Sequence, residues 1–214
     1  MDDLIRIENL TKIYMPKVVL NNISCSIPKG QSVAFVGHNG CGKSTLLKII
    51  AGLVKPTSGK IECGKKLLFH YVPEHFPKMQ LTAERYLRWM GRLDGIAEQE
   101  IGEKCRRLAA DFFMTDMLNI PMKNLSKGTL QKIGVIQALL AEPQVLLLDE
   151  PLDGQDTDSQ QVFIEKVNQL KAKEATILMS CHEPELIRQI ADKVYRLENG
   201  LYEADDQAVN AVSI

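Results

Sequence analysis

The sequence predicts an α/β domain built around a phosphate-binding loop, with a helical subdomain inserted into it. Residues 37–45 read GHNGCGKST and lie between a short apolar run at 32–36 and a helical run at 44–53. A second apolar run, VLLLDE at 145–150, ends in two acids. Between these motifs, residues 81–142 lose the strand pattern and take up helical spacing. A strand, a glycine loop and a helix, followed later by another buried strand, indicate a parallel sheet.

The glycine loop fits the pattern G-x-x-x-x-G-K-[ST], with Gly37, Gly42, Lys43 and Ser44 in the fixed positions. Glycines let successive backbone N–H groups turn toward a polyphosphate, and the following helix presents its positive dipole end to the same anion. The pattern predicts that Lys43 contacts the outer phosphates and that the Ser44 hydroxyl is a ligand for Mg²⁺. The flanking strand and helix favour this interpretation over a chance glycine-rich turn.

The chain before residue 81 is predicted to form strands joined by turns, because β-branched residues recur between Pro and Gly. The predicted strands span 4–10, 18–27, 31–36 and 65–74, and a turn at 55–61 leads to another strand.

The block from 81 to 142 is predicted to contain three helices. The first two, LTAERYLRWMGRL and EQEIGEKCRRLAADFF, are separated by Asp94-Gly95. The third starts at Ser126, a suitable N-cap, and ends before Pro143. The core then resumes with a strand at 144–150, a helix at about 159–172, a strand at 176–182, a helix at 184–192 and a hairpin around Asn199-Gly200.

Two carboxylates lie at the C-terminal end of the second apolar strand. Ligands of open α/β sheets bind at such strand ends. Asp149 is expected to hold Mg²⁺ directly or through water, and Glu150 to orient and deprotonate the water that attacks a γ-phosphate. The alternative is a strand that ends in solvated acids. The position downstream of a phosphate loop favours the catalytic interpretation.

LSKGTLQK at 125–132 has two interpretations. In the first interpretation, the backbone N–H groups of Ser126 to Gly128, at the start of a helix, form an anion site. In the second interpretation, Ser126 only caps the helix and has no other role. Taken alone, the segment favours the cap.

The composition argues against several other classes of protein. With 26 basic and 27 acidic residues and no charge block, the chain is not predicted to bind nucleic acid. Five scattered cysteines without a CxxC indicate reduced thiols in a cytosolic protein. No apolar run approaches the roughly 18–20 residues needed to cross a bilayer. Any membrane role is therefore expected to come through a partner.

Together these motifs resemble the nucleotide-binding subunit of an ABC transporter, over roughly residues 4–200. The resemblance implies a P-loop NTPase core, with a RecA-like parallel sheet and an antiparallel β subdomain, plus the inserted helical subdomain. It implies a single ABC ATP-binding domain over 1–214. The catalytic α/β core would comprise 1–80 and 143–214, and the helical subdomain 81–142.

The resemblance also implies a role for each motif. Tyr14 matches the aromatic residue that stacks on adenine, Glu74 stands at the Q-loop position, and Asp156 matches the D-loop aspartate. In the family two subunits enclose two ATP molecules, and the signature motif of one completes the site of the other. The implied ATP-binding residues are Tyr14, Gly37, His38, Asn39, Gly40, Cys41, Gly42, Lys43, Ser44 and Thr45, with Ser126 and Gly128 acting in trans. The implied metal ligands are Ser44, Glu74 and Asp149, and the implied catalytic residues are Lys43, Glu150 and His182.

Several positions depart from the family pattern, among them 152–155 beside the D-loop aspartate. Glu74 stands where the family usually has Gln, and its carboxylate would add negative charge beside the metal. We expect tighter Mg²⁺ binding and altered coupling to the membrane partner as a result. Lys127 and Thr129 replace a glycine and the glutamine of the usual signature. Hydrolysis is still expected, because Glu150 is present.

The resemblance therefore predicts an ATP-hydrolysing subunit, with ATP and Mg²⁺ as cofactors. It would lie on the inner face of the cell membrane, bound to a transmembrane permease subunit and paired with a second ATP-binding subunit, as a homodimer. The short helical block resembles bacterial drug or antibiotic exporters. The first alternative is a soluble ABC-type ATPase that acts on nucleic acid, and the lack of a second such domain and of a coiled-coil insertion argues against it. The second is a small-molecule kinase, against which the signature segment and His182 argue.

Overall fold

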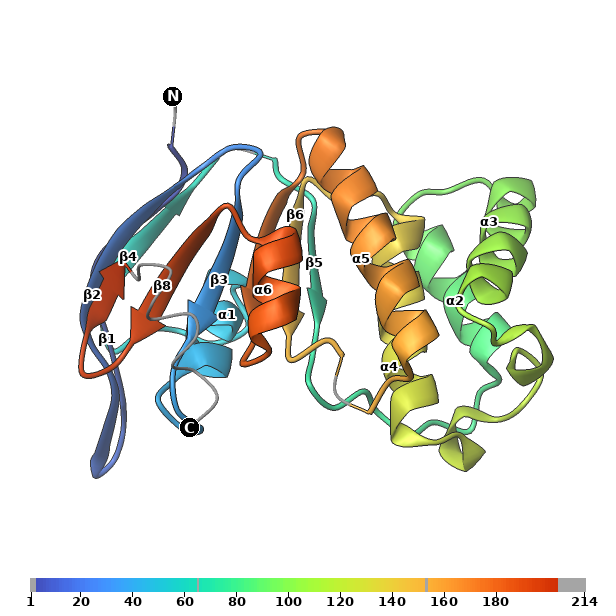
Figure 1. Ribbon diagram of the computed structural model, residues 1–214, viewed down its shortest axis with the longest axis horizontal. Coiled ribbons are helices and arrows are strands. Elements are labelled where there is room, and N and C mark those ends of the chain that lie inside the picture. The colour runs from blue at the N-terminus through green and yellow to red at the C-terminus, as the bar shows by residue number, and fades with distance from the viewer. Residues whose placement is uncertain (1–2, 65, 153, 204–214) are drawn as a thin grey trace. The chain divides into compact units, whose positions relative to one another are not determined.

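The computed structural model describes residues 3–64, 66–152 and 154–203. Within these ranges it contains a six-stranded sheet, a three-stranded sheet and helices, so the predicted α/β class is confirmed (Figure 1).

The six-stranded sheet carries the predicted phosphate loop and the two acids. Its strand order is β5-β6-β7-β3-β8-β9. β3 pairs in parallel with β7 and β8, β6 pairs in parallel with β7, and β9 returns antiparallel to β8. All residues of β3, β6 and β7 are buried, as expected of the apolar runs that form parallel strands. The strands are β3 (Ser32–Val36), β5 (Phe69–Val72), β6 (Val145–Asp149), β7 (Thr176–Ser180), β8 (Lys193–Leu197) and β9 (Leu201–Glu203).

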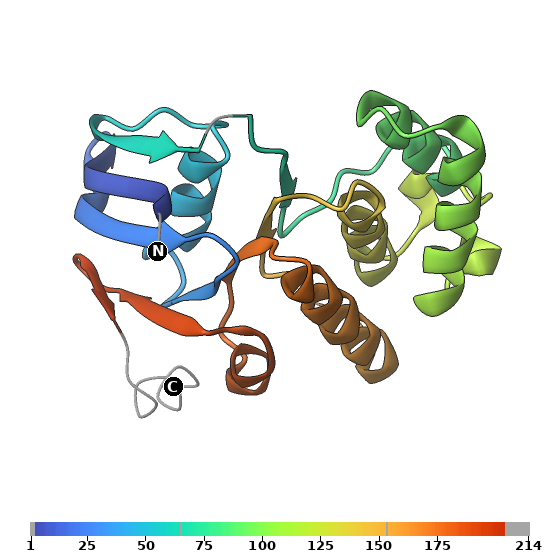
Figure 2. The same ribbon diagram turned by 90° about the horizontal axis from the view of Figure 1, so that it is seen from above.

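The three-stranded sheet is antiparallel and amphipathic. β1 (Asp3–Tyr14) lies between β2 (Lys17–Pro28) and β4 (Ser58–Cys63). Ile5 and Ile7 of β1 are buried while their neighbours are more exposed, which is the period-two pattern of a sheet with one covered face. Figure 2 shows this sheet beside the first helix.

That helix, α1 (Lys43–Ile50), shares one apolar core with both sheets. Leu46 and Leu47 are fully buried in the same cluster as Phe35 of β3 and Leu147 of β6. Because β3, β6 and β7 run in parallel, their carboxyl ends meet at one edge of the sheet. The fold therefore brings the start of the glycine loop and the acids of the second apolar strand to the same place.

Helices dominate the middle of the chain, as predicted. The Thr82 hydroxyl accepts a hydrogen bond from Arg85 N and caps α2, and the Ser126 hydroxyl accepts one from Thr129 N and caps α4. The elements of this part are α2 (Ala83–Leu93), α3 (Glu98–Asp111), the 3₁₀ turns η1 (Thr115–Met117) and η2 (Met122–Asn124), and α4 (Lys127–Leu140).

The last two helices are α5 (Thr157–Ala172) and α6 (Pro184–Ile190). The predicted hairpin around Asn199-Gly200 is confirmed by the antiparallel pairing of β8 and β9. In the part of the chain that the structure describes, no helix has both the length and the apolar composition needed to cross a membrane.

The chain divides into two compact units. The first unit holds 1–71, 144–150 and 168–214, and the second holds 72–143 and 151–167. Compared with the predicted helical block of 81–142, the second unit also contains 72–80, 143 and 151–167. The part of α5 up to Val167 belongs to the second unit, in which Lys166 Nζ lies 2.6 Å from Asp111 Oδ2 of α3.

Candidate functional site

The glycine loop joins β3 to α1 in a conformation that requires glycine at two fixed positions. Gly37 has φ 147° and Gly42 has φ 114°, both in the region that side chains rarely adopt. A Cβ at Gly37 would lie 2.6 Å from the carbonyl oxygen of Leu197, and one at Gly42 would lie 2.9 Å from that of Val19. Backbone conformation and space therefore both require the glycines of the pattern.

Lys43, the first residue of α1, is buried and turned back onto the loop. Its Nζ donates to the carbonyl oxygen of Gly37 at 2.8 Å and to that of His38 at 3.4 Å. The same ammonium lies 3.9 Å from Glu150 Oε1. One positive charge is thus held between the phosphate loop and the second acid of the buried strand.

Asp149 lies at the end of β6 and is 1% exposed. Its Oδ1 accepts hydrogen bonds from Ser44 Oγ at 2.8 Å and from Ser180 Oγ at 2.7 Å. Its Oδ2 accepts a hydrogen bond from Tyr71 Oη at 2.8 Å. The two residues predicted to bind metal in this unit, Ser44 and Asp149, therefore lie in direct contact.

Glu150 follows the strand with φ 47°, an unusual conformation for a side-chain-bearing residue. Its backbone N–H is held by both the carbonyl and the hydroxyl of Ser180, at 3.2 and 3.1 Å. Its carboxylate Oε2 lies 2.9 Å from His182 Nδ1. Burial raises the pKa of Glu150, and the neighbouring His182 and Lys43 oppose that rise. A carboxylate with a raised pKa is suited to accept a proton.

The sequence predicts that Glu150 is the general base of a hydrolysis reaction, and the pH dependence of that reaction follows from these contributions. Glu150 must be deprotonated to fill this role, so kcat is expected to fall as the pH drops through its raised pKa, above the ordinary 4.5. His182→Ala removes the largest contribution that opposes the rise. We expect the pH below which kcat falls to be higher in this variant than in wild type, as measured on its residual activity. A value that is unchanged or lower would contradict this account of Glu150.

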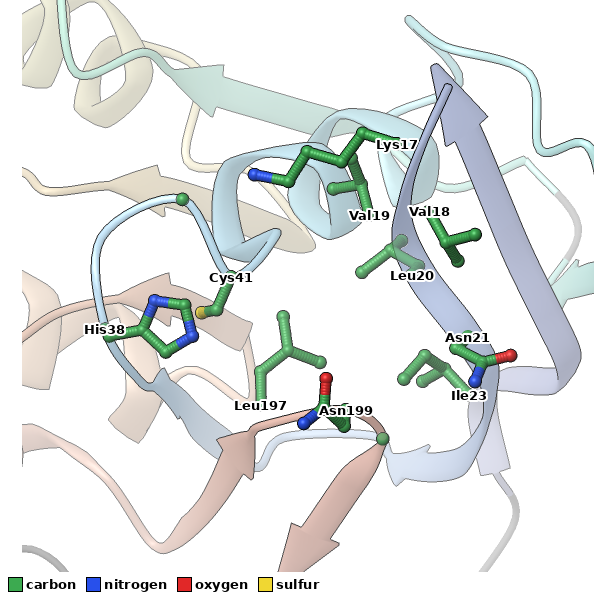
Figure 3. Close-up of a pocket in the computed structure, with 12 residues that line it drawn as sticks. Lys17, Val18, Val19, Leu20, Asn21, Ile23, His38, Cys41, Leu197 and Asn199 are labelled. Carbon is green, nitrogen blue, oxygen red and sulfur yellow. The ribbon is translucent and has the colours of Figure 1, made fainter. Parts of the chain in front are cut away.

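A cavity of about 200 Å³ adjoins the loop on the side of β2 (Figure 3). Loop residues His38 and Cys41 face it, Lys17 and Val19 of β2 form another wall, and Asn199 also lines it. Polar and apolar groups thus meet beside the loop.

Tyr14 ends β1 and does not line that cavity. It is 48% exposed, and Lys12 Nζ lies 4.7 Å from the centre of its ring. Lys12 Nζ also donates to the carbonyl oxygen of Lys55 at 2.8 Å. The ammonium of Lys12 therefore lies over the ring.

The second unit holds four of the predicted residues, Glu74, Ser126, Gly128 and Asp156. The Ser126 hydroxyl caps α4 and also lies 2.8 Å from Thr129 Oγ1, so the predicted helix cap is present. Gly128 packs so closely on the Asp156 segment that a Cβ on it would overlap the carbonyl oxygen of Gly154. Glu74 is half exposed, and its Oε1 lies 3.5 Å from His75 Nδ1.

Asp156 is fixed to the helix that follows the signature segment. Lys132 Nζ lies 2.8 Å from its Oδ2 and also donates to the carbonyl oxygen of Phe112 at 3.3 Å. Ser159 donates to both carboxylate oxygens through its backbone N–H and its hydroxyl. The hydrogen bond from Lys132 holds the pKa of Asp156 well below its usual range. Asp156 is therefore not a freely solvated loop acid.

Comparison with known proteins decides the family. The sequence pattern described as ABC transporter matches residues 20–153, more than half of the chain. The chain belongs to the ABC transporter family. ATP-binding domains of this family are ATPases that power transport together with transmembrane permease components, and this chain is an ATP-binding subunit of that kind.

Individual relatives of this ABC subunit agree with that result. It is 33% identical over 193 residues to the ABC transporter ATP-binding protein NatA of Bacillus subtilis (strain 168), covering 85% of this chain and 78% of NatA. It is 33% identical over 198 residues to the zinc import ATP-binding protein ZnuC of Photorhabdus laumondii, covering 91% of this chain and 74% of ZnuC. A solved ATP-binding subunit of an ABC transporter is 30% identical with a TM-score of 0.85, covering 95% of this chain and 91% of that one. The predicted P-loop NTPase fold is confirmed.

Sequence reasoning missed one residue of this ABC site and one contact. Ser180 was expected only as part of a strand, yet its hydroxyl bonds to Asp149 and its backbone and hydroxyl hold Glu150. Tyr71 was expected only as part of the strand at 65–74, yet its hydroxyl donates a hydrogen bond to Asp149. The signal that could have found Ser180 is register, since Asp149 of β6 pairs with Ser180 of β7.

The donor set around Asp149 suits Mg²⁺. Ser44 and Asp149 offer hydroxyl and carboxylate oxygens within 2.8 Å of each other. In the described ranges no cluster of three or more His, Cys, Asp or Glu side chains could hold a metal ion alone. Mg²⁺ in nucleotide sites typically takes one or two protein ligands, with phosphates and waters as the rest. The site therefore fits a metal that arrives with a nucleotide.

Proposed function

We propose that this ABC subunit hydrolyses Mg²⁺·ATP at the site formed by the loop and the two acids, and that ATP-driven dimerisation on a separate transmembrane permease couples hydrolysis to transport. The observation that carries the proposal is the convergence of Lys43, Asp149, Glu150 and His182 at one edge of the parallel sheet. Each of these side chains has a contact suited to phosphoryl transfer to water.

The loop from Gly37 to Thr45 wraps the phosphates with its backbone N–H groups, and Lys43 leaves its carbonyl partners to contact the outer phosphates. Tyr14 stacks on the base. Beside the loop, the cavity walls at Lys17, His38 and Cys41 offer contacts to the sugar.

Glu150 accepts the proton of the attacking water, and His182 holds the Glu150 carboxylate through Nδ1. When both ring nitrogens of His182 carry a proton, Nε2 donates to the γ-phosphate as well. Ser44 and Asp149 would hold Mg²⁺, which would supply positive charge to the phosphates. The role of Glu74 as a metal ligand stays a prediction from the sequence, where its carboxylate stands in place of a neutral amide.

Ser126 and Gly128 act in trans, on the nucleotide bound by a second identical chain. The contact between Gly128 and the Asp156 segment supports this assignment, because both segments would meet the partner together.

The subunit would lie on the inner face of the membrane through its permease. Export of a drug or antibiotic stays a prediction from the sequence. The relative named for zinc import points to the opposite direction. The identity of the permease decides between them.

Capture of the permease tests the proposal. The Glu150→Gln variant, tagged and purified with ATP from detergent-solubilised membranes of its own host, is expected to recover a polytopic membrane protein. The control is Glu185→Gln, the same change at an exposed glutamate of α6, which should recover less because its ATP is hydrolysed. Recovery of soluble partners alone, with the chain absent from membranes, would contradict the transport role and favour the soluble ATPase.

A further inference from the structure

The Asp149 carboxylate receives three hydroxyl hydrogen bonds, and they are divided unequally between its oxygens. Ser44 and Ser180 donate to Oδ1, while Tyr71 donates to Oδ2 at 2.8 Å. All three donors are neutral, so they leave the charge of the carboxylate available to a cation. A buried carboxylate oxygen is costly to leave without a donor, and the phenol of Tyr71 serves Oδ2.

Tyr71 occupies a special place along the chain. It lies in β5, beside β6 in the sheet, and it packs partly buried against the apolar core of the first unit. The chain passes to the second unit directly after Tyr71, and again directly after Glu150. The hydrogen bond between Tyr71 and Asp149 therefore joins two strand ends from which the chain leaves the first unit. Core packing fixes the ring, so the hydroxyl is a rigid partner for Oδ2.

We propose that Tyr71 is a positioning residue for the metal-binding carboxylate of Asp149. This inference rests on the proposed function, because it assumes that Asp149 holds Mg²⁺ beside the nucleotide. With Oδ2 tied to the phenol, the carboxylate cannot rotate, and Oδ1 stays beside the Ser44 hydroxyl. Hydrogen bonds that orient metal ligands commonly change metal affinity by about 10- to 100-fold when they are removed. Tyr71 thereby contributes to metal binding without touching metal or nucleotide.

A purely structural role for Tyr71 predicts something different. If the ring only fills space beside the core, Tyr71→Phe keeps that packing and leaves metal binding unchanged. If the hydroxyl positions Asp149, the same variant keeps the fold and weakens metal binding selectively. The matched control is Tyr195→Phe, which removes a phenol hydroxyl from another core tyrosine, one that stacks on Phe35.

The test measures the affinity of a fluorescent, nonhydrolysable ATP analogue with and without Mn²⁺, which stands in for Mg²⁺. The dissociation constant without Mn²⁺ divided by that with Mn²⁺ measures the coupling between metal and nucleotide. Tyr71→Phe is expected to reduce this ratio about ten-fold while leaving the metal-free dissociation constant close to that of wild type. Tyr195→Phe should leave both unchanged. In steady-state assays at limiting Mg²⁺, Tyr71→Phe should need more Mg²⁺ to reach half of its maximal rate.

Several outcomes would overturn the inference. A coupling ratio in Tyr71→Phe that equals or exceeds that of wild type would show that the hydroxyl does not position the ligand. An equal loss in metal-free affinity, or an equal loss in Tyr195→Phe, would indicate general disturbance of the core. If the wild-type chain binds the analogue with no contribution from Mn²⁺, the proposed metal site itself fails, and that failure is visible before any variant is made.

Discussion

Replacing Glu150 by glutamine is expected to lower kcat for ATP hydrolysis by about two to four orders of magnitude, the usual contribution of a general base. Glutamine keeps the size of the side chain and a hydrogen-bond acceptor for His182, but it cannot take the proton of the attacking water. Lys43 and the glycine loop are untouched, so the dissociation constant for ATP should change little. Phosphate release and equilibrium ATP binding, measured on the same preparation, check both halves of this prediction.

Glu185→Gln is the control, since Glu185 is an exposed residue of α6 paired with Arg188. It should retain the full rate. A Glu150→Gln variant that hydrolyses ATP at a rate near that of wild type would show that another group is the base. Loss of ATP binding in parallel with loss of hydrolysis would show that Glu150 acts mainly by holding Lys43 in place.

Replacing Gly128 by alanine is expected to destabilise the folded chain by roughly 1–3 kcal/mol, the range found when atoms are added to a packed site. The added Cβ would overlap the carbonyl oxygen of Gly154, which belongs to backbone and cannot move alone. Because the Asp156 segment is also tied to Lys132, the strain is expected to reach that ion pair. Denaturant unfolding gives the free energy, and ATPase activity should fall with it if the two segments act together.

Gly102→Ala is the matched control. Gly102 also lies inside a helix, but a Cβ there would meet Arg88 Nη2, at 3.2 Å, which is the far end of a flexible side chain. Alanine favours helix over glycine by roughly 0.5–1 kcal/mol, so this variant should be neutral or more stable. If both variants lose the same stability, the close packing of Gly128 on Gly154 is not the cause.

The sequence predicted local features of this molecule well, since each is encoded by neighbouring residues. The glycine loop, the buried strand ending in Asp149 and Glu150, and the cap at Ser126 all combine a short pattern with a physical reason, and the structure contains each element. The likeness of the motifs to a known family then gave the fold, which relatives confirmed.

Contacts between distant segments were not predictable in the same way. The hydrogen bond from Tyr71 to Asp149 depends on β5 lying beside β6. The hydrogen bond from Ser180 to Asp149 depends on the register between β6 and β7. Lys132 reaches Asp156 across 24 residues of sequence. Such pairings depend on how strands and helices are arranged, which a local pattern of residues does not specify. The left-handed conformation of Glu150 was missed for the same reason, because the β7 strand holds it.

The most direct test of the account is the steady-state rate of phosphate release from ATP by the purified chain, with Mg²⁺ and with excess chelator. We expect repeated turnover that requires Mg²⁺ and that is lost in both Lys43→Ala and Asp149→Asn, because those side chains lie at the loop and at the proposed metal site. Hydrolysis that persists in both variants, or that does not depend on the metal, would contradict the claim that this edge of the sheet is the ATPase site.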